Sequence, residues 1–596
     1  MMQRLQASHF SLVGSVGLCL LSTSGNAGGE AARGAKSEAV ASPPVQACTG
    51  TPVRVTQEGA IFTLDNGDVQ ATIDTSTARL PSFRFRGVEM MSVGGYYNFG
   101  TNIFTAGPFT GRLVVDPATN GGEVAEVSMT TSWGGGAGVV PLDIDVRYAL
   151  PRCSRGVYEY VGLTHPENYP AFSPGEMRIN HYVRWDDVFD WYAVDDVRRG
   201  PFPSQADVSL GAAIPGAPIE VRQYTSGPFA HLPGWQKYDV SIAWGEGARR
   251  AAQLLGRHPL LRWLRAGARQ STPRKGHGPL APLRQRYRAR GQRGHDALWK
   301  DAQDQLVREQ EQWPYSWESD PRYLPRAARG SVAGAITFSD TEQPALTSEY
   351  AWVGLAGPPV AGAPNFEHQG WDYQYWTAAD ANGTFSFENV RPGSYTLHAF
   401  REGIHGVYMG EPDAVRVSAG AAVLMGDVAW NADRLGPTVW ELGSPDRTPR
   451  EFYRGDRAWQ YGTNLLFPND FPNGVDFVVG TSDPSRDWNY LQPGGTWTLR
   501  FNLEDIPANV VSASLVLDVA GSDGVTVDAN LNGASIGPAR FLYRDGSISR
   551  DQPHGVLQSD RLTISLDQLT SGENALTLTS SARLMWDYIR LEWVTR

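Results

Sequence analysis

Short runs in which apolar and polar residues alternate recur along the chain, and this period-two pattern predicts β-strands. In the first third of the chain the runs occupy residues 60–64, 69–73, 111–115, 124–128 and 144–148. Gly, Asn and Asp separate the runs, and β-branched or aromatic residues are frequent within them, as is typical of strands. Because no helical period interrupts them, we expect a large antiparallel β domain that reaches past residue 240.

Two further strand-rich units follow. Residues 328–433 alternate at 331–336, 350–355 and 395–400, with turn sequences at 380–383 and 390–394, and predict a small β-sandwich. Residues 434–596 alternate at 497–501, 513–519 and 575–579, end on a strand-like run at 586–592, and fit a jelly-roll sandwich. The predicted fold class is therefore all-β and multidomain, with residues 50–327 as the first domain.

The N-terminus has the features of a secretory signal peptide over residues 1–27. Arg4 supplies the positive charge, residues 10–21 are mostly apolar, and the small residues at 25–27 suit a cleavage site. The apolar run is too short for a membrane-spanning helix, so a membrane anchor is disfavoured. We expect a secreted protein, extracellular or periplasmic, with residues 28–49 as a flexible leader rich in Ala, Gly, Ser and Pro.

Two cysteines, Cys48 and Cys153, remain in the mature chain after Cys19 leaves with the signal. Export would permit them to form a disulfide. Two free buried thiols are the alternative, and the sequence does not decide between them.

The net charge of −11 argues against nucleic acid as the main partner. An acidic protein still binds a polyanionic sugar where Arg or Lys side chains are placed locally. Lysine is nearly absent, and the chain contains only Lys36, Lys237, Lys275 and Lys300. Any catalytic lysine must come from this short set.

One segment, residues 249–293, departs from the rest of the chain. From Arg249 to His295 there are 12 arginines, one lysine and no acidic residue, and the β pattern stops. Such a run is a basic patch for a polyanion or a solvated basic loop. A third interpretation is a frameshift in GC-rich DNA that recovers near Gly294, which resequencing of the gene would test.

Three groups of motifs, taken in order, resemble one known family. The first group is at residues 313–317 (WPYSW) and 329–334 (RGSVAG). The second is at 373–377 (YQYWT), 382–383 (NG) and 389–393 (NVRPG). The third is at 435–443 (LGPTVWELG), 445–447 (PDR), 451–453 (EFY) and 487–488 (DW). Together they are similar to the rhamnogalacturonan endolyases of polysaccharide lyase family 4, over nearly all of the mature chain except residues 249–291.

The resemblance implies a galactose-mutarotase-like super-β-sandwich as the catalytic domain, a fibronectin-III-like middle domain, and a carbohydrate-binding-module-like jelly roll. It also implies β-elimination at the galacturonate of the rhamnose–galacturonate backbone of pectin, leaving an unsaturated uronate. The family needs no metal and no cofactor for this reaction. The expected partner is rhamnogalacturonan I, and we expect a monomer that binds neither nucleic acid nor membrane.

The chemistry of β-elimination requires a cation and a base. Positive groups neutralise the uronate carboxylate and stabilise the enolate, and a base removes the C5 proton. The family uses a lysine and a downstream histidine that follows a glycine. Lys237, before Tyr238, and His295, after Gly294, match these positions. We assign Lys237 to charge stabilisation and His295 as the base, with exchanged roles as an alternative; a strand lysine and a surface histidine are the plain interpretations.

Two arginines are predicted to bind the substrate. Residues 175–178 resemble the family stretch that supplies arginines to the cleft, which makes Arg178 and Arg184 candidates to hold galacturonate carboxylates. Salt bridges to Asp186, Asp187 or Asp190 are the alternative. The family also carries a Gly-Gly-Pro segment between the lysine and the histidine, and this chain lacks it.

Two other classes of function stay open. The first is a catalytically impaired pectin-binding protein of the same fold, because the segment 249–293 replaces part of the expected cleft. The second is a hydrolase with paired carboxylates, for which Asp195 and Asp196 or Asp186 and Asp187 are available. Adjacent residues of a strand point to opposite faces, which disfavours such pairs.

Overall fold

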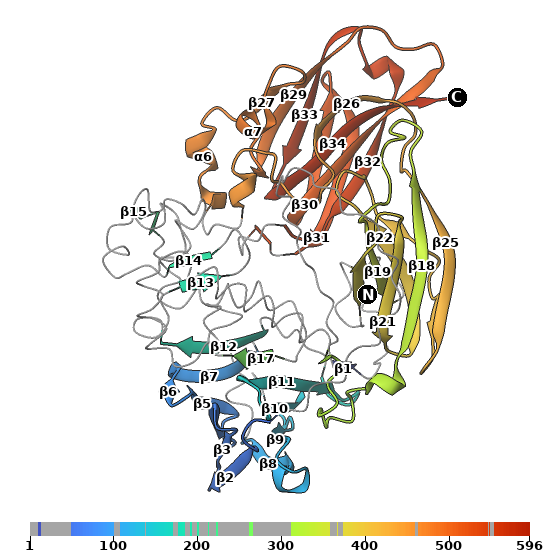
Figure 1. Cartoon of the computed structure of the whole chain (residues 1–596). Coiled ribbons are helices and arrows are strands. Elements are labelled where there is room, and N and C mark those ends of the chain that lie inside the picture. The colour runs from blue at the N-terminus through green and yellow to red at the C-terminus, as the bar shows by residue number, and fades with distance from the viewer. Residues whose placement is uncertain are drawn as a thin grey trace, which may run out of the picture. The chain divides into compact units, whose positions relative to one another are not determined.

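The structure is a computed structural model, and its elements are almost all β-strands (Figure 1). It describes residues 10–12, 49–99, 108–136, 139–170, 177–184, 191–193, 199–201, 212–213, 222–223, 262–265, 312–357, 366, 374–458, 463–545, 547–548 and 554–596. The chain divides into two units, Met1–Val194 with Ala252–Tyr323, and Asp195–Ala251 with Leu324–Arg596. The predicted all-β, multidomain fold class is confirmed.

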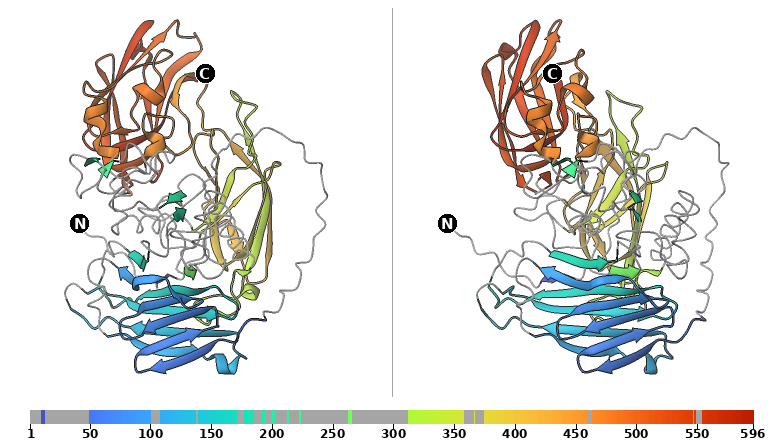
Figure 2. Two further views of the ribbon diagram at one scale, coloured as in Figure 1. Left: turned by 60° about the vertical axis from the view of Figure 1, so that its left-hand side comes forward. Right: turned by 90° about the vertical axis from the view of Figure 1, so that its left-hand side faces the viewer.

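Two antiparallel sheets build the first unit, and Figure 2 shows their strands as stacked layers. One sheet has the order β1 (Phe10–Leu12), β11 (Gly156–His165), β10 (Asp143–Pro151), β9 (Val124–Thr131) and β8 (Thr110–Val115), and β17 (Arg262–Arg265) also pairs with β11. The other has the order β12 (Met177–Val183), β7 (Met91–Phe99), β5 (Arg79–Phe85), β4 (Val69–Asp74), β3 (Ile61–Asp65) and β2 (Arg54–Glu58), with β6 (Val88–Glu89) beside β5. The unit also contains η2 (Pro117–Thr119) and β13 (Trp191–Ala193).

The five strands predicted in this region are all present, with ends that differ by a few residues. Their alternation follows burial: Leu64 and Ile73 are fully buried, while their neighbours along β3 and β4 are only partly buried. β1 falls within the predicted signal peptide, and removal of that peptide stays a prediction.

Cys153 is disulfide-bonded, and the backbone N–H of Gly50 donates to its sulfur over 3.1 Å. Its expected partner, Cys48, lies outside the described residues. Cys153 lies in the turn between β10 and β11 with φ of 58°, so the disulfide attaches this turn to the segment that carries its partner.

A small sandwich forms the first part of the second unit, and the predicted domain bounds of 328–433 stay a prediction. One sheet has the order β21 (Thr384–Val390), β18 (Gly330–Ser339) and β25 (Ala422–Asn431). The other has the order β20 (Tyr375–Ala378), β19 (Trp352–Ala356), β22 (Gly393–Phe400) and β23 (Tyr408–Met409), with β24 (Val415–Val417) beside β22. β18 and β25 are parallel, which alternation does not reveal because it carries no information on the direction of a partner strand.

The C-terminal sandwich is organised by one long strand, β30 (Val510–Leu531). Its first half pairs with β32 (Gln558–Ile564) and β34 (Leu584–Thr595), and its second half pairs with β31 (Ala534–Arg544) and β33 (Gly572–Ser580). The remaining strands are β26 (Thr438–Gly443), β27 (Asp476–Val478), β28 (Leu491–Gln492) and β29 (Gly495–Leu503). The unit also contains η3 (Arg326–Ala328), η4 (Gly455–Arg457), η5 (Thr463–Leu465), α6 (Phe467–Asp470), α7 (Pro484–Asp487), η7 (Leu566–Gln568), β14 (Arg199–Pro201), β15 (Ala212–Ala213) and β16 (Arg222–Gln223).

Three tryptophans lie at the centre of this C-terminal core. The Trp488 ring meets the rings of Trp497 and Trp586 edge to face, with centroids 4.9 and 5.7 Å apart. All three side chains are fully buried. Rings of this size bury much apolar surface and prefer edge-to-face geometry, so this cluster stabilises the sandwich.

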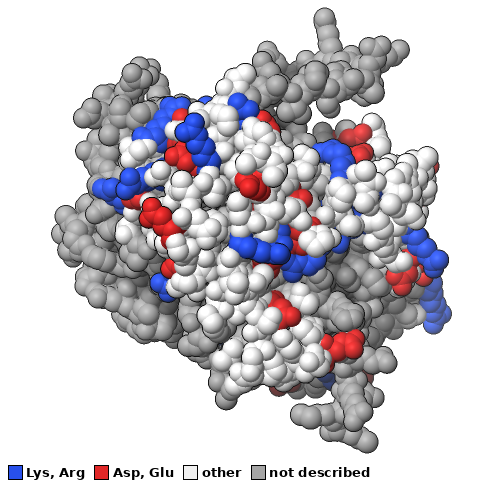
Figure 3. Space-filling model, turned by 90° about the horizontal axis from the view of Figure 1, so that it is seen from below, with Lys and Arg blue, Asp and Glu red and all other residues white. Residues whose placement is uncertain are grey.

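Charged side chains of both signs are interspersed among uncharged ones on the face shown in Figure 3. Surface ion pairs of the first unit include Arg86 with Asp68 and Arg152 with Glu123. Within the described part of the chain, no helix has the length and apolar character that crossing a bilayer requires.

Candidate functional site

The predicted proton-transfer pair, Lys237 and His295, lies outside the described residues. The two predicted arginines are placed at one strand. Arg178 lies in β12, where its backbone is in register with Asn98 of β7. Arg184 follows the strand directly and is partly buried, and its backbone N–H donates to the carbonyl of Met90 over 3.0 Å. The structure thus places Arg178 and Arg184 on or just after β12, and a role for Lys237 with His295 stays a prediction.

A buried chain of polar side chains holds β12 against the facing sheet. The Nε2 atom of His181 on β12 lies 2.7 Å from Oε2 of Glu159 on β11, and both side chains are buried. The Tyr148 hydroxyl on β10 donates to the other Glu159 oxygen over 2.9 Å. Because these groups are closed off from solvent, they position the strand that carries the predicted arginines and do not contact a polysaccharide. The sequence signal was a histidine at an apolar position of the strand, two residues after Ile179 and two before Val183.

A second polar network lies on the opposite face of the same sheet. The Arg147 guanidinium on β10 donates to Glu126 over 3.0 Å and to Asp145 over 2.9 Å. It also donates to the Ser319 hydroxyl over 3.2 Å, and Asp320 is paired with Arg322 at that place. Residues 318–322 therefore close over the outer face of β9 and β10.

The ionisation of this network follows from its burial. Burial opposes the charge of Arg147, but Tyr160 and the surrounding carboxylates raise its pKa above the usual range. Burial, and then repulsion by Glu126, raise the pKa of Glu318 to about 8. The hydroxyl of Tyr160 contacts both Glu126 and Glu318. A single hydroxyl proton cannot serve both carboxylates, so a proton held on Glu318 completes the hydrogen bonds of the group.

Aromatic rings from the WPYSW motif cover the neighbouring part of this face. Tyr315 and Trp317 pack against Tyr158 of β11, with ring centroids 5.2 and 4.8 Å away, and stack on each other at 5.1 Å. The Tyr323 hydroxyl accepts from the backbone N–H of Tyr315 over 2.7 Å. The motif thus anchors residues 313–323 on the sheet, and its role is structural.

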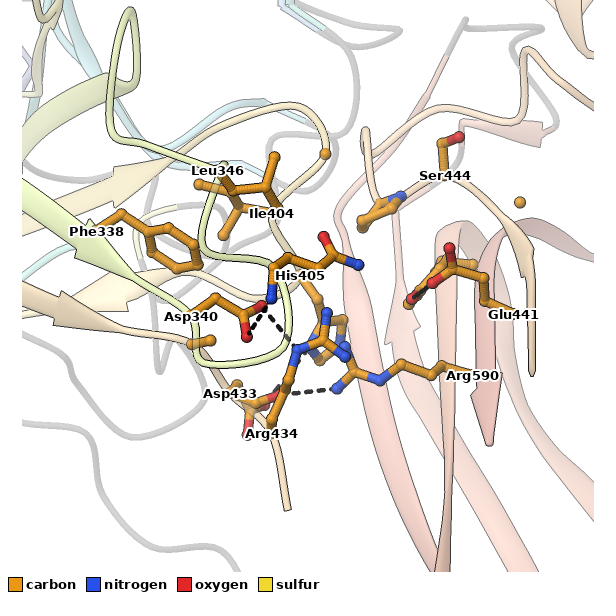
Figure 4. A pocket seen from close by; sticks show the side chains of 16 residues that line it. Phe338, Asp340, Leu346, Ile404, His405, Asp433, Arg434, Glu441, Ser444 and Arg590 are labelled. Atoms are coloured by element: carbon orange, nitrogen blue, oxygen red, sulfur yellow. Dashed lines mark hydrogen bonds and ion pairs between the residues drawn. The ribbon is translucent and has the colours of Figure 1, made fainter. Parts of the chain in front are cut away.

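The second unit contains a cavity of about 180 Å³ that no sequence pattern predicted (Figure 4). Its walls come from the small sandwich, from the linker at Asp433 and Arg434, and from β26 and β34 of the C-terminal sandwich. Gly443 at the end of β26 borders it: φ is +86°, and a Cβ there would lie 2.4 Å from the carbonyl oxygen of Asp587. A larger residue at Gly443 would disrupt this wall.

Acidic groups are buried close to this cavity. Burial raises the pKa of Asp587 well above its usual range and raises that of Glu451 to about 8. Nearby Asp518 and Asp446 add to the shift of Asp587. Among the residues that the structure describes, no three His, Cys, Asp or Glu side chains are grouped as metal ligands would be.

Comparison with known families matches three successive segments of the chain. Residues 113–218 match the rhamnogalacturonate lyase family, residues 329–424 match domain II of polysaccharide lyase family 4, and residues 438–591 match the carbohydrate-binding-module-like domain III of that family. The all-β fold and the three matches together define the class of the protein, which is a polysaccharide lyase architecture of three parts. The chain belongs to polysaccharide lyase family 4.

Curated relatives agree with this assignment. The chain is 30% identical over 308 residues to the rhamnogalacturonate lyase of Dickeya dadantii, covering 49% of each chain. It is 31% identical over 243 residues to the probable rhamnogalacturonate lyase B of Aspergillus niger, covering 36% of this chain and 33% of that one. The matched stretches therefore span about half or less of these relatives. A family 35 carbohydrate-binding module from an environmental isolate is 15% identical, with 20% of this chain and 81% of that chain covered and a TM-score of 0.14.

Proposed function

We propose that this protein is a rhamnogalacturonan lyase, which cleaves the rhamnose–galacturonate backbone of pectin by β-elimination. The observation that carries the proposal is the ordered match of three segments to one lyase family, with curated relatives named as rhamnogalacturonate lyases. The predicted signal at residues 1–27 fits an enzyme that meets this polysaccharide outside the cell or in the periplasm.

The reaction needs a positive environment for the uronate carboxylate. In the proposed site, Arg178 and Arg184 hold galacturonate carboxylates, and Lys237 stabilises the enolate that forms when the C5 proton leaves. A guanidinium suits this binding because it offers parallel donors to a carboxylate. The buried bond between His181 and Glu159 supports this part of the proposal, because it limits the movement of the strand on which the arginines depend.

Proton transfer is assigned to His295. As a neutral imidazole it accepts the C5 proton, and the bond between C4 and its oxygen breaks as the C4–C5 double bond forms. Lys237 is the alternative base, in which case His295 serves the leaving oxygen. The elimination consumes no water and requires no oxidant.

The assignment of the site is tested by product formation on rhamnogalacturonan I, followed by the ultraviolet absorbance of the unsaturated uronate. We expect His295→Ala and Lys237→Ala each to lower the rate by about 10²–10⁴-fold. Lys36→Ala in the leader and His554→Ala in the C-terminal sandwich are the matched controls and should retain full activity. Full activity in both site variants would show that the residues are wrongly assigned.

A non-catalytic pectin-binding protein is the second candidate, and the segment 249–293 is the observation that favours it. Retardation of the protein in gels that contain rhamnogalacturonan, with no unsaturated product from the unaltered chain, would support this candidate over the lyase.

A further inference from the structure

Residues 318–322, the covering segment, lie over the outer face of β9 and β10 and are among the last residues of the first unit. Polar contacts attach this segment to the sheet. The Ser319 hydroxyl donates to Glu126 over 2.7 Å, and a guanidinium nitrogen of Arg322 lies 3.3 Å from Asp145. Because Ser319 is exposed, the covering segment borders solvent, and water can replace its contacts with the sheet when it moves outward.

Two carboxylates meet at a single hydroxyl beneath this segment. The Tyr160 hydroxyl on β11 is within hydrogen-bonding distance of Oε1 of Glu126 and of Oε1 of Glu318. The backbone N–H of Asp320 also donates to Oε1 of Glu318, over 2.8 Å. Oε2 of Glu318 is buried and has no hydrogen-bond partner among the residues that the structure describes. An ionised Glu318 would place charge on an oxygen without a donor and beside a second carboxylate, so the closed arrangement requires a proton on Glu318.

The charged and titratable groups that face Glu318 come from each strand beneath it and from the covering segment itself. They are Glu126 of β9, Asp145 and Arg147 of β10, Tyr160 of β11, and Asp320 and Arg322 of the segment. Arg147 is already engaged by Glu126 at 3.0 Å and by Asp145 at 2.9 Å. Burial of Glu318 and repulsion by Glu126 therefore outweigh the attraction of this cation.

One of these groups has a pKa that is shifted into the neutral range. Burial, and then Glu126, raise the pKa of Glu318 to about 8. Burial and the two glutamates raise the pKa of Tyr160 above its usual range, so its hydroxyl keeps its proton. Burial opposes the ionisation of Asp320, but hydrogen bonds from Arg322 hold its pKa below the usual range. Glu318 is thus the group whose proton couples the segment to pH.

We propose that the covering segment is a pH-operated closure: a proton on Glu318 keeps residues 318–322 on the sheet, and loss of this proton lets them open. In the open segment Glu318 meets water and ionises near 4.5, as an ordinary glutamate does. The open state therefore binds fewer protons than the closed state between about pH 4.5 and 8, and rising pH favours opening across this window. Above pH ~8 both states are ionised, and the balance no longer changes.

The opening is local, because the preceding residues are attached by aromatic packing. The ring of Trp317 lies 4.8 Å from that of Tyr158 on β11 and stacks on Tyr315 at 5.1 Å. An indole ring carries no group that titrates in this range, so the attachment does not depend on pH. The residues that lead into the second unit are thus held in acid and released toward pH ~8.

Hydrogen–deuterium exchange of the full chain between pH 5 and pH 9, measured by mass spectrometry with millisecond labelling, tests the proposal. The protection factor, which is the intrinsic rate divided by the observed rate, removes the pH dependence of the exchange chemistry. The backbone N–H groups of Asp320 and Arg322 are the reporters, since they donate to side-chain oxygens of Glu318 and Asp320 over 2.8 and 2.9 Å. We expect their protection to fall by about tenfold per pH unit between pH ~5 and ~8 and then to level off.

Glu318→Gln is the decisive variant, because its amide stays neutral and keeps a donor at every pH. Its protection factors over residues 318–322 should not change with pH. Glu123→Gln is the matched control: it makes the same substitution in the first unit, at a side chain that is 57% exposed, and should behave as the unaltered chain does. Protection that is independent of pH in the unaltered chain, or that falls equally in Glu318→Gln, would overturn the proposal.

Peptides of β9 and β10 show whether the opening is confined to the covering segment. Their protection factors should stay constant from pH 5 to pH 9 in the unaltered chain and in both variants. If they fell in parallel with those of residues 318–322, the proton would act on the whole sheet, and the local closure would be contradicted.

Discussion

The tryptophan core of the C-terminal sandwich and the ionic network on the β8–β11 sheet are held together by different interactions. The C-terminal sandwich buries apolar side chains around Trp488, Trp497 and Trp586, and it also buries charged side chains, among them Asp518, Asp587, Arg590 and Glu592. The β8–β11 sheet of the first unit buries apolar side chains on one face, but on the other it buries the ionic network of Glu126, Arg147 and Glu318. Both regions thus bury charged as well as apolar side chains, but the tryptophan core is held by apolar packing and the network around Arg147 by ion pairs.

The difference shows what each arrangement provides. Apolar packing is non-directional and tolerates small shifts, so it serves a domain that has to be stable. A buried ionic network requires defined partner geometry and adds little net stability, but removing one member leaves the others uncompensated. We infer that the network holds residues 318–322 in one position on the sheet. These residues follow the predicted base, His295, along the chain.

The largest effect should come from Arg147→Ala. It leaves Glu126 and Asp145 buried without their cation, and we expect a loss of about 3–5 kcal/mol in the free energy of unfolding of the first unit. Hydrogen–deuterium exchange should rise in peptides of β9–β11 and of residues 313–323, and stay unchanged in β29–β34. The matched control is Arg500→Ala, which also removes an arginine between two acids but at an exposed site, and should change stability by less than about 1 kcal/mol. If Arg147→Ala and Arg500→Ala lowered stability equally, the buried network would not differ in energy from exposed ion pairs.

The reciprocal experiment is Leu517→Ala in β30. Leu517 is fully buried in the C-terminal core, and the cavity left behind should reduce stability by roughly 3 kcal/mol. Exchange should then rise in β29–β34 and not in β9–β11. Leu542→Ala, at a side chain that is 64% exposed in the same domain, should stay within about 0.5 kcal/mol of the unaltered chain. Exchange that spreads into β9–β11 would show that the two regions open together.

A smaller effect, limited to one pH range, should follow from Glu318→Gln. In the unfolded chain this carboxyl ionises near 4.5, whereas in the folded chain its pKa is about 8. Between these values the folded state keeps a proton that the unfolded state has lost, so Glu318 makes stability fall as pH rises through this window. Gln cannot ionise, and its amide N–H can replace the carboxyl proton of Glu318 as the donor to the Tyr160 oxygen. The variant should therefore match the unaltered chain below pH ~4.5 and exceed it by a few kcal/mol above pH ~8 in urea denaturation. A constant difference across pH would contradict the protonated state of Glu318.

The strands could be predicted from the sequence where burial alternates locally. Runs such as 69–73 and 513–519 contain their own signal, because one face of the strand is apolar. The ionic network could not be predicted this way: Glu126 and Arg147 occupy the polar positions of their strands and would be expected to face solvent. They are buried only because residues 318–322 return to cover them from more than 150 positions further along the chain.

The candidate sites also differ in how far a local sequence pattern predicts them. Arg178 and Arg184 were chosen by resemblance, and the structure locates them at β12 without testing what they bind. Side chains from several distant segments form the cavity between the small sandwich and β34, so no local sequence pattern predicts it. His181 is the exception, because a polar residue at an apolar strand position already indicates a buried partner.

The account depends most on the claim that the backbone is broken by elimination, and the fate of solvent oxygen tests this claim directly. Rhamnogalacturonan I is incubated with the full chain in water enriched in heavy oxygen, and the fragments are weighed by mass spectrometry. A lyase gives fragments with an unsaturated galacturonate end and no heavy oxygen from the cleavage step. Saturated fragments that carry one heavy oxygen for each bond broken would show hydrolysis and contradict the account.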